Sequence, residues 1–329
     1  MMKAAITAAF ILPVRNRWLY TQAILQQLTT QISQADAPAD YTLIVADDGS
    51  SDGTPEQIVE RFPGVVLLRG TGDWWWTGAI AAGMDYALGQ TTAQTLIWLN
   101  DDLELAPDFL AQLQQLCSSE DAQAAIVGGI VRDRHHPNWL VFSGLAQGRP
   151  VRQMTDFQDQ AKIAADTLNG NIVVIPRQVA EQLGRPDVRR FPHYGGDYEY
   201  TERAKQVGVP LYLSQFLQGY ADYTVADVVR YMPVWLQWRL APTGAQKWQV
   251  LRALWTLKFH HNVRHIVNRM YIQQAQVPRW RYWLFYSKKV LQCLGSLRLS
   301  RPTLRSRLRA YCTEQCIPPH LLQQLEARL

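Results

Sequence analysis

The chain has 329 residues and is 47% hydrophobic, which is enough for the core of one large domain or two ordinary ones and excludes a disordered protein. Its four cysteines show no pairing pattern, so we expect a reducing compartment and no disulfide framework. No segment approaches the roughly 18 uncharged apolar residues that are needed to span a bilayer.

The net charge of +5 is distributed unevenly along the chain. Residues 231–329 carry 16 Lys and Arg and two acids, a balance of +14, which leaves 17 basic and 26 acidic residues, a balance of −9, for residues 1–230. Half of the 12 tryptophans also lie after residue 230. We therefore expect an acidic body over residues 1–225, with halves at 1–117 and 118–225, followed by a basic, aromatic and helical region over residues 226–329.

The first half of the body alternates strands and helices. Its N-terminal apolar run is expected to be a strand rather than a signal peptide, because it ends in Pro13 and a basic turn without a small-residue cleavage site. The expected elements are strands over Ala5–Leu12, Tyr41–Ala46, Val65–Arg69 and from Thr95, and helices over Trp18–Ile32, from Thr54 and over Ala79–Leu88. This alternation predicts an α/β fold with a mostly parallel sheet flanked by helices.

The stretch Thr95–Leu105 combines an apolar run with a polar interruption at Asn100, Asp101 and Asp102. The apolar run reads as a buried parallel strand, whose carboxyl end is where open α/β sheets bind their ligands. Adjacent carboxylates repel each other unless a cation lies between them, and hard oxygen ligands suit Mg²⁺ or Mn²⁺ bound together with substrate phosphates. The pair therefore predicts a divalent metal on a diphosphate or, as the simpler alternative, a solvated loop or helix cap.

Two earlier loops also carry candidate ligand residues. Asp47 and Asp48 end a predicted strand in the sequence DDGSSDGT, which is either a ligand loop or a polar turn with Gly49 and Ser50 as turn residues. The next loop contains three consecutive tryptophans, Trp74–Trp76, between glycines. Because three adjacent tryptophans cannot all face one core, we expect at least one of them to line a cleft or an interface.

Shorter strands are expected after residue 117, over Ile126–Val131, Trp139–Leu145 and Ile172–Ile175, with exposed turn histidines at 135 and 136. Helices are expected over Gln178–Leu183 and Tyr198–Gln206. The second of these places Asp197 at a helix N-terminus, where the helix dipole favours an ionised carboxylate. Asp197 is therefore either a helix cap or a general base for a hydroxyl group.

Residues 5–215 resemble the inverting family 2 glycosyltransferases, which have the GT-A fold. The resemblance depends on four motifs in order: Pro13 with Asn16 and Arg17, followed by DDGSSDGT; WWWTGAIAAG, similar to the WW-T/S-G loop of a bacterial subgroup; LNDDLEL at the position of the DXD-type motif; and GGDYEYTERAKQVG, in which an acid is followed by Arg203 and Gly208. Each motif is weak alone, whereas four in order are specific.

The resemblance implies transfer of a sugar, with inversion, from a nucleotide-diphosphate donor, and a role for each matching residue. Asp47 or Asp48 would hold the nucleotide base, Asp102 aided by Asp101 would bind Mn²⁺ or Mg²⁺, and Asp197 would be the catalytic base. The nucleotide-sugar site would comprise Pro13, Asn16, Arg17, Asp47, Asp48, Gly49, Ser50, Trp76, Gly78 and Asp101. The acceptor side would comprise Asn169, Gly170, Gly196, Glu199 and Arg203.

The chain departs from the family pattern at three places. Asn100 replaces an acid that many members have, and Ala81 and Ala82 stand where relatives often have an asparagine near the sugar. The segment between Gly208 and Val225 contains Tyr220 and Asp222 but no histidine to serve as a further metal ligand. These departures leave the metal affinity and the donor open.

The residue types support this chemistry independently of the family. A cation that neutralises a departing diphosphate removes the need for a general acid, and one carboxylate can deprotonate the attacking hydroxyl. A glycoside hydrolase would instead need paired carboxylates flanking the sugar. Two alternatives remain: a non-catalytic nucleotide-sugar-binding or scaffolding protein of polysaccharide assembly, and a nucleotidyltransferase, which would normally need a glycine-rich basic loop early in the chain.

The basic region combines arginines and lysines with tryptophans over residues 246–271 and again over 278–289, as interfacial helices do. The alternatives are a helical subdomain packed on the body, a homo-oligomer contact and, least favoured, nucleic-acid binding. We therefore expect a cytoplasmic cell-envelope enzyme in peripheral contact with the anionic inner face of the plasma membrane. Its acceptor would be a glycan or a lipid-linked sugar, and no nucleic acid is expected as a partner.

Overall fold

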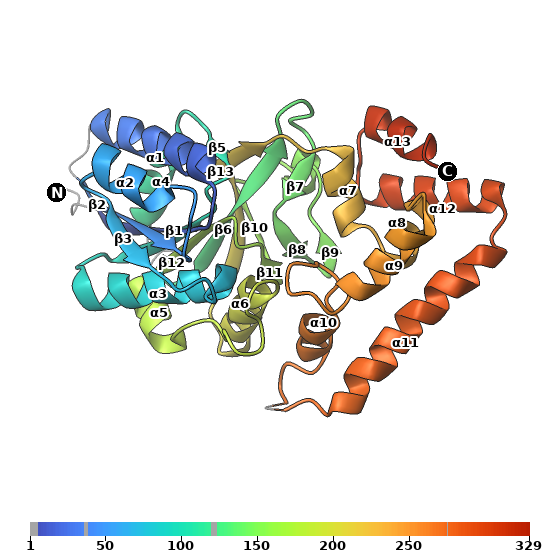
Figure 1. Cartoon of the computed structure of the whole chain (residues 1–329). Helices are drawn as coiled ribbons and strands as arrows, with labels where there is room; N and C mark the ends of the chain where they lie inside the picture. The colour runs from blue at the N-terminus through green and yellow to red at the C-terminus, as the bar shows by residue number, and fades with distance from the viewer. Residues whose placement is uncertain (1–5, 36–38, 120–123, 275) are drawn as a thin grey trace. The chain divides into compact units, whose positions relative to one another are not determined.

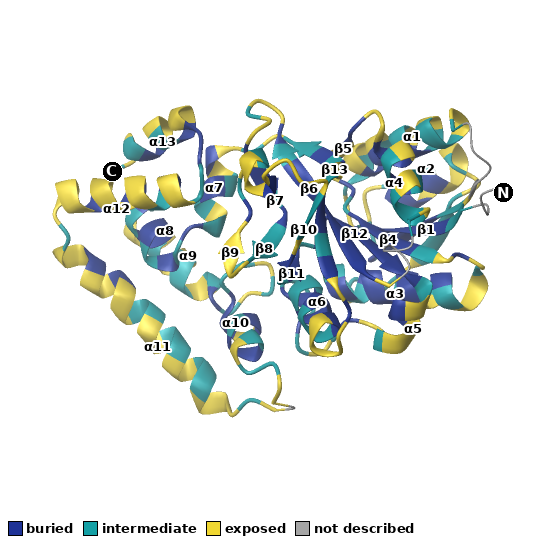
Figure 2. Cartoon of the chain, turned by 180° about the vertical axis from the view of Figure 1, so that it is seen from behind, coloured by how far each residue is buried: buried dark blue, intermediate teal, exposed yellow. Residues whose placement is uncertain are grey.

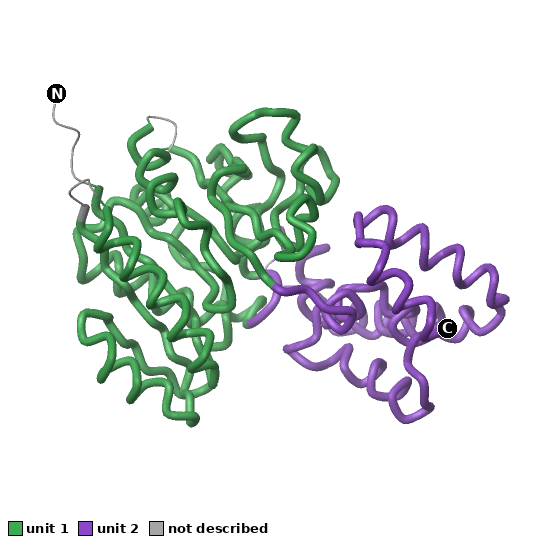
Figure 3. The backbone as a smooth tube through the Cα atoms, turned by 90° about the horizontal axis from the view of Figure 1, so that it is seen from above, with its two compact units in different colours: residues 1–192, 196–221 green, residues 193–195, 222–329 purple. Residues whose placement is uncertain are grey.

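The computed structural model describes residues 6–35, 39–119, 124–274 and 276–329. The chain forms two compact units, one comprising Met1–Pro192 and Gly196–Ala221 and the other comprising His193–Gly195 and Asp222–Leu329 (Figure 3). The short segment His193–Gly195, which the sequence placed inside the body, thus groups with the second unit. Ala5, the expected start of the first strand, lies outside the described residues.

The first half of the first unit alternates strands and helices, as predicted. Its elements are β1 (Ile6–Val14), α1 (Trp18–Ser33), β2 (Ala39–Asp47), α2 (Thr54–Arg61), β3 (Val66–Arg69), α3 (Trp75–Gln90) and β4 (Thr95–Leu99). The four strands are parallel and lie in the order β4, β1, β2, β3. Helices α1 and α2 lie along one face of the sheet and α3 along the other (Figure 1).

The second half extends the same sheet with strands of mixed direction. Its elements are β5 (Glu104–Leu105), α4 (Phe109–Cys117), β6 (Ile126–Asp133), β7 (Leu140–Phe142), β8 (Gly144–Ala146), β9 (Arg149–Pro150), β10 (Lys162–Ala164), β11 (Thr167–Leu168), β12 (Ile172–Pro176), α5 (Arg177–Leu183), α6 (Gly196–Gln206) and β13 (Leu211–Ala221). The sheet runs β10, β13, β6, β12, β4, β1, β2, β3, and a separate small sheet joins β11, β8 and β9.

The register of the parallel strands brings four polar segments to one edge of the sheet. Val14 at the end of β1 pairs with Asp47 at the end of β2, which pairs with Arg69 at the end of β3. Trp98, one residue before the end of β4, pairs with Ile11 of β1. The polar segments that follow β1, β2, β3 and β4 are therefore neighbours because the strands are parallel and in register.

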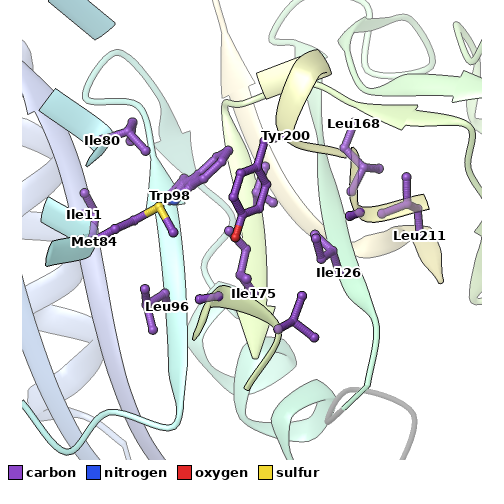
Figure 4. Packing of buried hydrophobic residues seen from close by; sticks show 14 of the residues in the cluster. Ile11, Ile80, Met84, Leu96, Trp98, Ile126, Leu168, Ile175, Tyr200 and Leu211 are labelled. Carbon is purple, nitrogen blue, oxygen red and sulfur yellow. The ribbon is translucent and has the colours of Figure 1, made fainter. Parts of the chain in front are cut away.

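The core lies between the sheet and the helices that cover it (Figure 2). Trp98 is fully buried in β4 and packs between Met84 of α3 and Tyr200 of α6, with ring centroids 4.9 Å from Tyr200 (Figure 4). Helix α3 approaches β1 closely because Gly83 has no side chain: a Cβ there would lie 2.2 Å from Ile11 Cγ2. The alanine-rich helix therefore packs tightly on the sheet, as expected.

Several predicted bounds were wrong. Helix α3 begins at Trp75 rather than Ala79 because the loop before it is pinned by hydrogen bonds described below. The expected strand over 139–145 divides into β7 and β8, which belong to different sheets. Helix α6 begins at Gly196 rather than Tyr198. Strand β13 was not predicted, because its register shift between Leu213 and Gln218 removes a regular alternation of buried residues.

The second unit is helical, as predicted. Its helices are α7 (Val225–Tyr231), α8 (Val234–Leu240), α9 (Gly244–Ala253), α10 (Val263–Met270), α11 (Arg279–Gly295), α12 (Arg301–Glu314) and α13 (Pro319–Glu326). Side chains of Thr224, Thr243, Asn262 and Ser300 cap four of the helices by accepting backbone N–H groups. None of the helices in the described residues is long and apolar enough to cross a membrane.

Candidate active site

The loops that follow β1 and β2 are joined through one asparagine. The backbone N–H of Asn16 donates to Ser50 Oγ (2.7 Å), and Asn16 Oδ1 accepts from the backbone N–H of Ser51 (2.7 Å). Asn16 has a left-handed backbone with φ of 52°, which asparagine tolerates better than most residues. Pro13 lies one residue before the end of β1, opposite Ala46 of β2. The structure therefore brings the predicted Pro13, Asn16 and Ser50 together.

Asp48 holds the glycine-rich loop that follows β3. Its side chain is buried, and its Oδ1 accepts from the backbone N–H groups of Gly72 (2.9 Å) and Trp74 (3.0 Å), while Oδ2 accepts from that of Trp75 (2.8 Å). Arg15 Nη1 lies 3.5 Å from Oδ2. Burying a carboxylate is costly unless it is hydrogen-bonded and paired, and these donors provide both compensations. Asp48 therefore shapes the tryptophan loop from within.

Trp75, the first residue of α3, has a strained backbone with φ of 54°. Such a conformation costs about 1–3 kcal/mol and persists only where the surroundings impose it. The hydrogen bond from its N–H to Asp48 is one such restraint. Gly49 (φ 69°) permits the close approach of the two loops, because a Cβ there would lie 3.0 Å from the Gly72 nitrogen. Asp47 is also buried and binds Ser50, whose N–H donates to Oδ2 (3.1 Å) and whose hydroxyl donates to Oδ1.

Arg17 lies between the two aspartates that follow β4. Its Nη1 is 3.2 Å from Asp101 Oδ1, and its Nη2 donates to Asp102 Oδ2 at 2.7 Å. Asp101 is buried and its Oδ2 also accepts from Thr21 Oγ1 (3.2 Å), whereas the Asp102 side chain is 40% exposed. The cation expected between these carboxylates is, in this structure, a guanidinium group from the loop after β1.

Burial raises the pKa of the Asp101 carboxyl to about 7, although the nearby Arg17 guanidinium opposes this shift. In the described part of the chain, Asp101 Oδ1 receives no hydrogen bond, because Arg17 approaches it without hydrogen-bond geometry. Asp101 therefore faces the protein interior, and Asp102 is the carboxylate that solvent and ligands can reach.

Asn100 is engaged by side chains from two other loops. Trp76 Nε1 donates to Asn100 Oδ1 (2.8 Å), and Asn100 Nδ2 donates to Asn171 Oδ1 (2.5 Å). Asn171 Nδ2 in turn donates to Asn169 Oδ1. Trp76 also packs edge to face on the buried Trp98, with ring centroids 5.8 Å apart. The asparagine that departs from the family pattern therefore connects the loop after β4 with the start of α3 and the loop after β11.

Asp197 lies in the first turn of α6, as predicted. Its Oδ2 accepts from the backbone N–H of Gly170 (2.9 Å), and its Oδ1 accepts from that of Tyr198 (2.9 Å). Gly170 is tightly enclosed, because a Cβ there would lie 2.5 Å from the Trp76 ring and 3.1 Å from Asp197 Cβ. Gly196 is likewise enclosed, since a Cβ there would meet Thr77 Oγ1 at 2.4 Å. The N-terminal ends of α3 and α6 thus adjoin, with Asp197 between Gly170 and Gly196.

Glu199 and Arg203 hold the segment after α5. Arg203 Nε donates to Glu199 Oε1 (2.7 Å), and its other nitrogens donate to the carbonyls of Leu183 and Arg185. Glu199 is buried, and its Oε2 accepts from the backbone N–H of Asp187 (3.0 Å). The two residues lie on α6 with Asp197, but their side chains hydrogen-bond to each other and to the segment after α5.

The residues around Asp102 are compatible with a divalent cation that is bound mainly through a substrate. Across the described residues there is no cluster of three His, Cys, Asp or Glu side chains that could hold a metal ion alone. The amide of Asn100 is already engaged, and the Tyr220 hydroxyl, on the strand that pairs with β5, donates to Gln218 (3.3 Å). Mg²⁺ and Mn²⁺ sites of this kind use one or two carboxylates and complete their shell with phosphate oxygens and water.

The structure brings most of the predicted site residues to one edge of the sheet and to the adjoining end of α6. Gly78 lies one turn into α3, where a Cβ would meet Trp74 Cβ at 3.1 Å. Three contributors were missed from the sequence: Arg15, Thr21 and Asn171. Arg15 and Asn171 lie beside predicted residues and could have been included for that reason, whereas Thr21 is one turn into α1 and carries no signal of its own.

Comparisons with known proteins agree with this architecture. Residues 9–178, just over half of the chain, match the family model Glycosyl transferase family 2. The mannosyltransferase PcManGT from Pyrobaculum calidifontis, solved with GDP-Man and Mn²⁺, is similar over 98% of this chain and 85% of its own, with a TM-score of 0.50 and 15% identity. GalNAc-T7, solved with UDP, GalNAc and Mn²⁺, is similar over 67% of this chain and 43% of its own, with a TM-score of 0.51 and 14% identity. No curated protein has a sequence that matches this one.

The mixed sheet, its flanking helices and these structural neighbours define the GT-A fold, and the class of protein is a glycosyltransferase. The chain belongs to glycosyl transferase family 2.

Proposed function

We propose that the protein transfers a sugar, with inversion and with the help of a divalent metal, from a nucleotide-diphosphate sugar to a hydroxyl group of a glycan or lipid-linked acceptor. The observation that carries this proposal is the position of Trp76. Its indole N–H binds Asn100, next to Asp101 and Asp102, and its ring lies against Gly170, whose N–H binds Asp197. One side chain therefore links the proposed diphosphate side of the site with the proposed base.

The donor nucleotide would lie over the loops after β1 and β2. We assign the base contact to Asp47 rather than Asp48, because the Asp48 oxygens already serve three backbone N–H groups and Arg15. Asp47 binds only Ser50 among the described residues and retains acceptor capacity. Gly49 keeps the backbone here open to close approach.

Asp102, with Asp101 beside it, would hold Mn²⁺ or Mg²⁺, and the bound cation would neutralise the departing diphosphate. Arg17 now occupies the exposed carboxylate and has to share or release it when donor and metal bind. A guanidinium group that is released beside a diphosphate can bind phosphate oxygens in its turn. Arg17 therefore compensates the aspartates in the free protein and would contact the donor in the complex.

Asp197 would remove the proton from the acceptor hydroxyl as that oxygen attacks the anomeric carbon. The backbone N–H groups of Gly170 and Tyr198 orient the carboxylate, and a base on the face opposite to the leaving group gives inversion in a single displacement. Glu199 and Arg203 would support α6 in this position rather than contact the acceptor. Asn169 and Gly170 would form the adjoining wall.

The sequence motifs and the basic region support a more specific proposal for the subgroup, the type of transferase and its location. We place the protein in the bacterial subgroup with the WW-T/S-G loop, as a hexosyl- or deoxyhexosyltransferase of cell-envelope polysaccharide assembly. It would work in the cytoplasm in peripheral contact with the inner face of the plasma membrane, where a lipid-linked acceptor is available.

A donor panel tests the proposal. The protein is incubated with UDP-, GDP- and dTDP-sugars, with and without Mn²⁺, and release of the nucleoside diphosphate and thermal shift are both measured. We expect at least one donor to raise the melting temperature more with Mn²⁺ than without it and to be turned over. Binding without turnover across the panel and a range of sugar acceptors would contradict the enzyme and support a nucleotide-sugar-binding scaffold.

A further inference from the structure

Helix α11 exposes a stripe of mostly apolar and aromatic side chains. Five of its large apolar side chains are between 50% and 67% exposed, whereas large apolar residues elsewhere in the second unit mostly pack into its core. The members of the stripe, which we call the α11 face, are Trp280, Trp283, Leu284, Ser287, Leu291 and Leu294. Their spacing of three and four residues places them on one side of the helix.

The opposite side of α11 packs on the core of the second unit. Cys293 is buried, and Tyr282, Phe285 and Tyr286 pack on the core of the second unit. The Trp255 ring lies 5.6 Å from Tyr286. Helix α11 therefore has two apolar sides, and only one of them is used to build the unit.

The α11 helix and the chain around it in the sequence carry charge of a single sign. Residues 228–313 contain 16 Lys and Arg and no Asp or Glu. Within α11 itself, Arg279, Arg281 and Lys288 lie at the margins of the stripe by helical spacing. Lys289 lies on the packed side, with its Nζ 5.1 Å from the centroid of the Phe285 ring. An apolar stripe bordered by cations complements a surface that is apolar inside and anionic outside.

We propose that the α11 face docks on an anionic lipid bilayer, with the helix lying in the plane of the interface. Tryptophans and leucines would enter the boundary between headgroups and acyl chains, and the flanking cations would bind lipid phosphates. A helix of 17 residues presents a contact about 25 Å long, which is ample for an interfacial element but short of a membrane span.

An anionic bilayer fits the α11 face better than a nucleic acid or a second copy of the chain. A nucleic acid would be drawn to the cations but has no use for a row of exposed leucines, and a second copy of this face would bring two basic surfaces together. The α11 face would be the surface that makes the membrane contact of the proposed function, on which this inference rests. Its test needs no donor or acceptor, so its failure and the failure of the transferase proposal can be told apart.

The test is co-flotation of the full chain with vesicles. We expect binding to vesicles containing about one-third phosphatidylglycerol and much weaker binding to phosphatidylcholine alone. The triple variant Trp280→Gln, Leu284→Gln, Leu291→Gln should weaken binding to anionic vesicles at least about tenfold, because it removes three apolar anchors from the interface. Lys288→Glu should weaken it by a smaller factor, on the order of fivefold at low salt.

The matched control makes three substitutions of exposed apolar residues by Gln in the first unit instead of in α11. The variant Leu19→Gln, Val59→Gln, Val207→Gln alters three exposed apolar residues of the first unit and should bind vesicles like the unmodified chain. Circular dichroism checks that both triple variants are folded. Unchanged flotation of the α11 variant, equal binding to neutral vesicles, or a stable dimer that is lost in the α11 variant without any vesicle binding would each overturn the proposal.

Discussion

The two units differ in where their charged side chains lie. The first unit buries five carboxylates, Asp47, Asp48, Asp101, Asp133 and Glu199, and each of them is paired or hydrogen-bonded within the unit. In the described part of the second unit, every buried polar side chain is an amide, a hydroxyl or a histidine. Its cations lie on the surface of helices instead.

This difference has a physical reason. A buried carboxylate is costly unless donors surround it, so a fold retains such groups where their geometry serves the site. Three of the five, Asp47, Asp48 and Asp101, lie at the end of β2 or in the loops after β2 and β4. The second unit buries no carboxylate among the described residues, and the chain over residues 228–313 carries cations without any acid. The first unit is thus organised around a site, and the second around a surface.

The largest effect is expected at Asp197, the carboxylate of the first unit that we propose acts in the chemistry rather than in supporting the fold. Asp197→Asn keeps the shape of the side chain and one acceptor oxygen, so it can retain one of the two hydrogen bonds from Gly170 and Tyr198, but it removes the base. We expect transfer to fall about 10²–10⁴-fold while donor binding is retained. Asp108→Asn, on the exposed start of α4, is the matched control and should be neutral. An unchanged turnover in Asp197→Asn would remove this residue from the mechanism.

Gly170→Ala should disturb the connection between Trp76 and Asp197. Its new Cβ would lie 2.5 Å from the Trp76 ring, so the indole or the loop must shift. We expect kcat to fall on the order of 10–100-fold, because displacements of about 1 Å in a positioned site have effects of this size. Gly64→Ala, where nothing lies within 4 Å of the added Cβ, is the control. Equal activity of the two variants would show that Trp76 does not link the two sides.

Asp48→Ala tests whether a buried carboxylate of the first unit supports the fold. Three backbone N–H groups would lose their acceptor, and Trp75 would lose a restraint on its strained backbone. We expect the free energy of unfolding to fall by about 3 kcal/mol in urea titrations. Asp85→Ala, whose carboxylate is half exposed and paired only with Arg185 among the described residues, should cost less than about 1 kcal/mol. Similar losses would contradict the anchoring role.

The smallest expected effect is the loss of stability at low pH that is caused by His265, a buried histidine of the second unit. Burial is the main cause that lowers the pKa of His265 to about 4, and His261, His193 and Arg269 add to it. Because the unfolded pKa is about 6.5, the unfolded chain binds the proton first, and stability is lost as the pH falls from 6.5 towards 4. At pH 5 this histidine should cost about 2 kcal/mol relative to pH 7.5.

Urea titrations of the unmodified chain and of His265→Gln at both pH values provide the measurement. The variant is expected to be less stable at pH 7.5 but to lose about 2 kcal/mol less on acidification. If both proteins lose the same stability between the two pH values, His265 does not titrate as its burial indicates. The contrast between the units would then rest on the carboxylates alone.

Much of the fold could be predicted from the sequence because its signals are local. Apolar runs that end in polar residues located β1, β2 and β4, and the first turn of α6 was placed at Asp197 by two glycines and a helical pattern. The helical character of the second unit was equally apparent. Strand β13 and the division of β7 from β8 were not, because a register shift and a change of sheet leave no regular period in the chain.

The sequence by itself determined which polar groups follow which strands, and therefore that Asp47, Asp101 and Asp102 share an edge with Asn16. Only the tertiary structure decided what each of them touches. The partners of Asn100 are 24 and 71 residues away, and Arg17 reaches Asp102 across 85. It also decided that one apolar side of α11 is packed and the other exposed. Local periodicity specifies that a helix has an apolar side, whereas burial depends on what the rest of the chain brings against it.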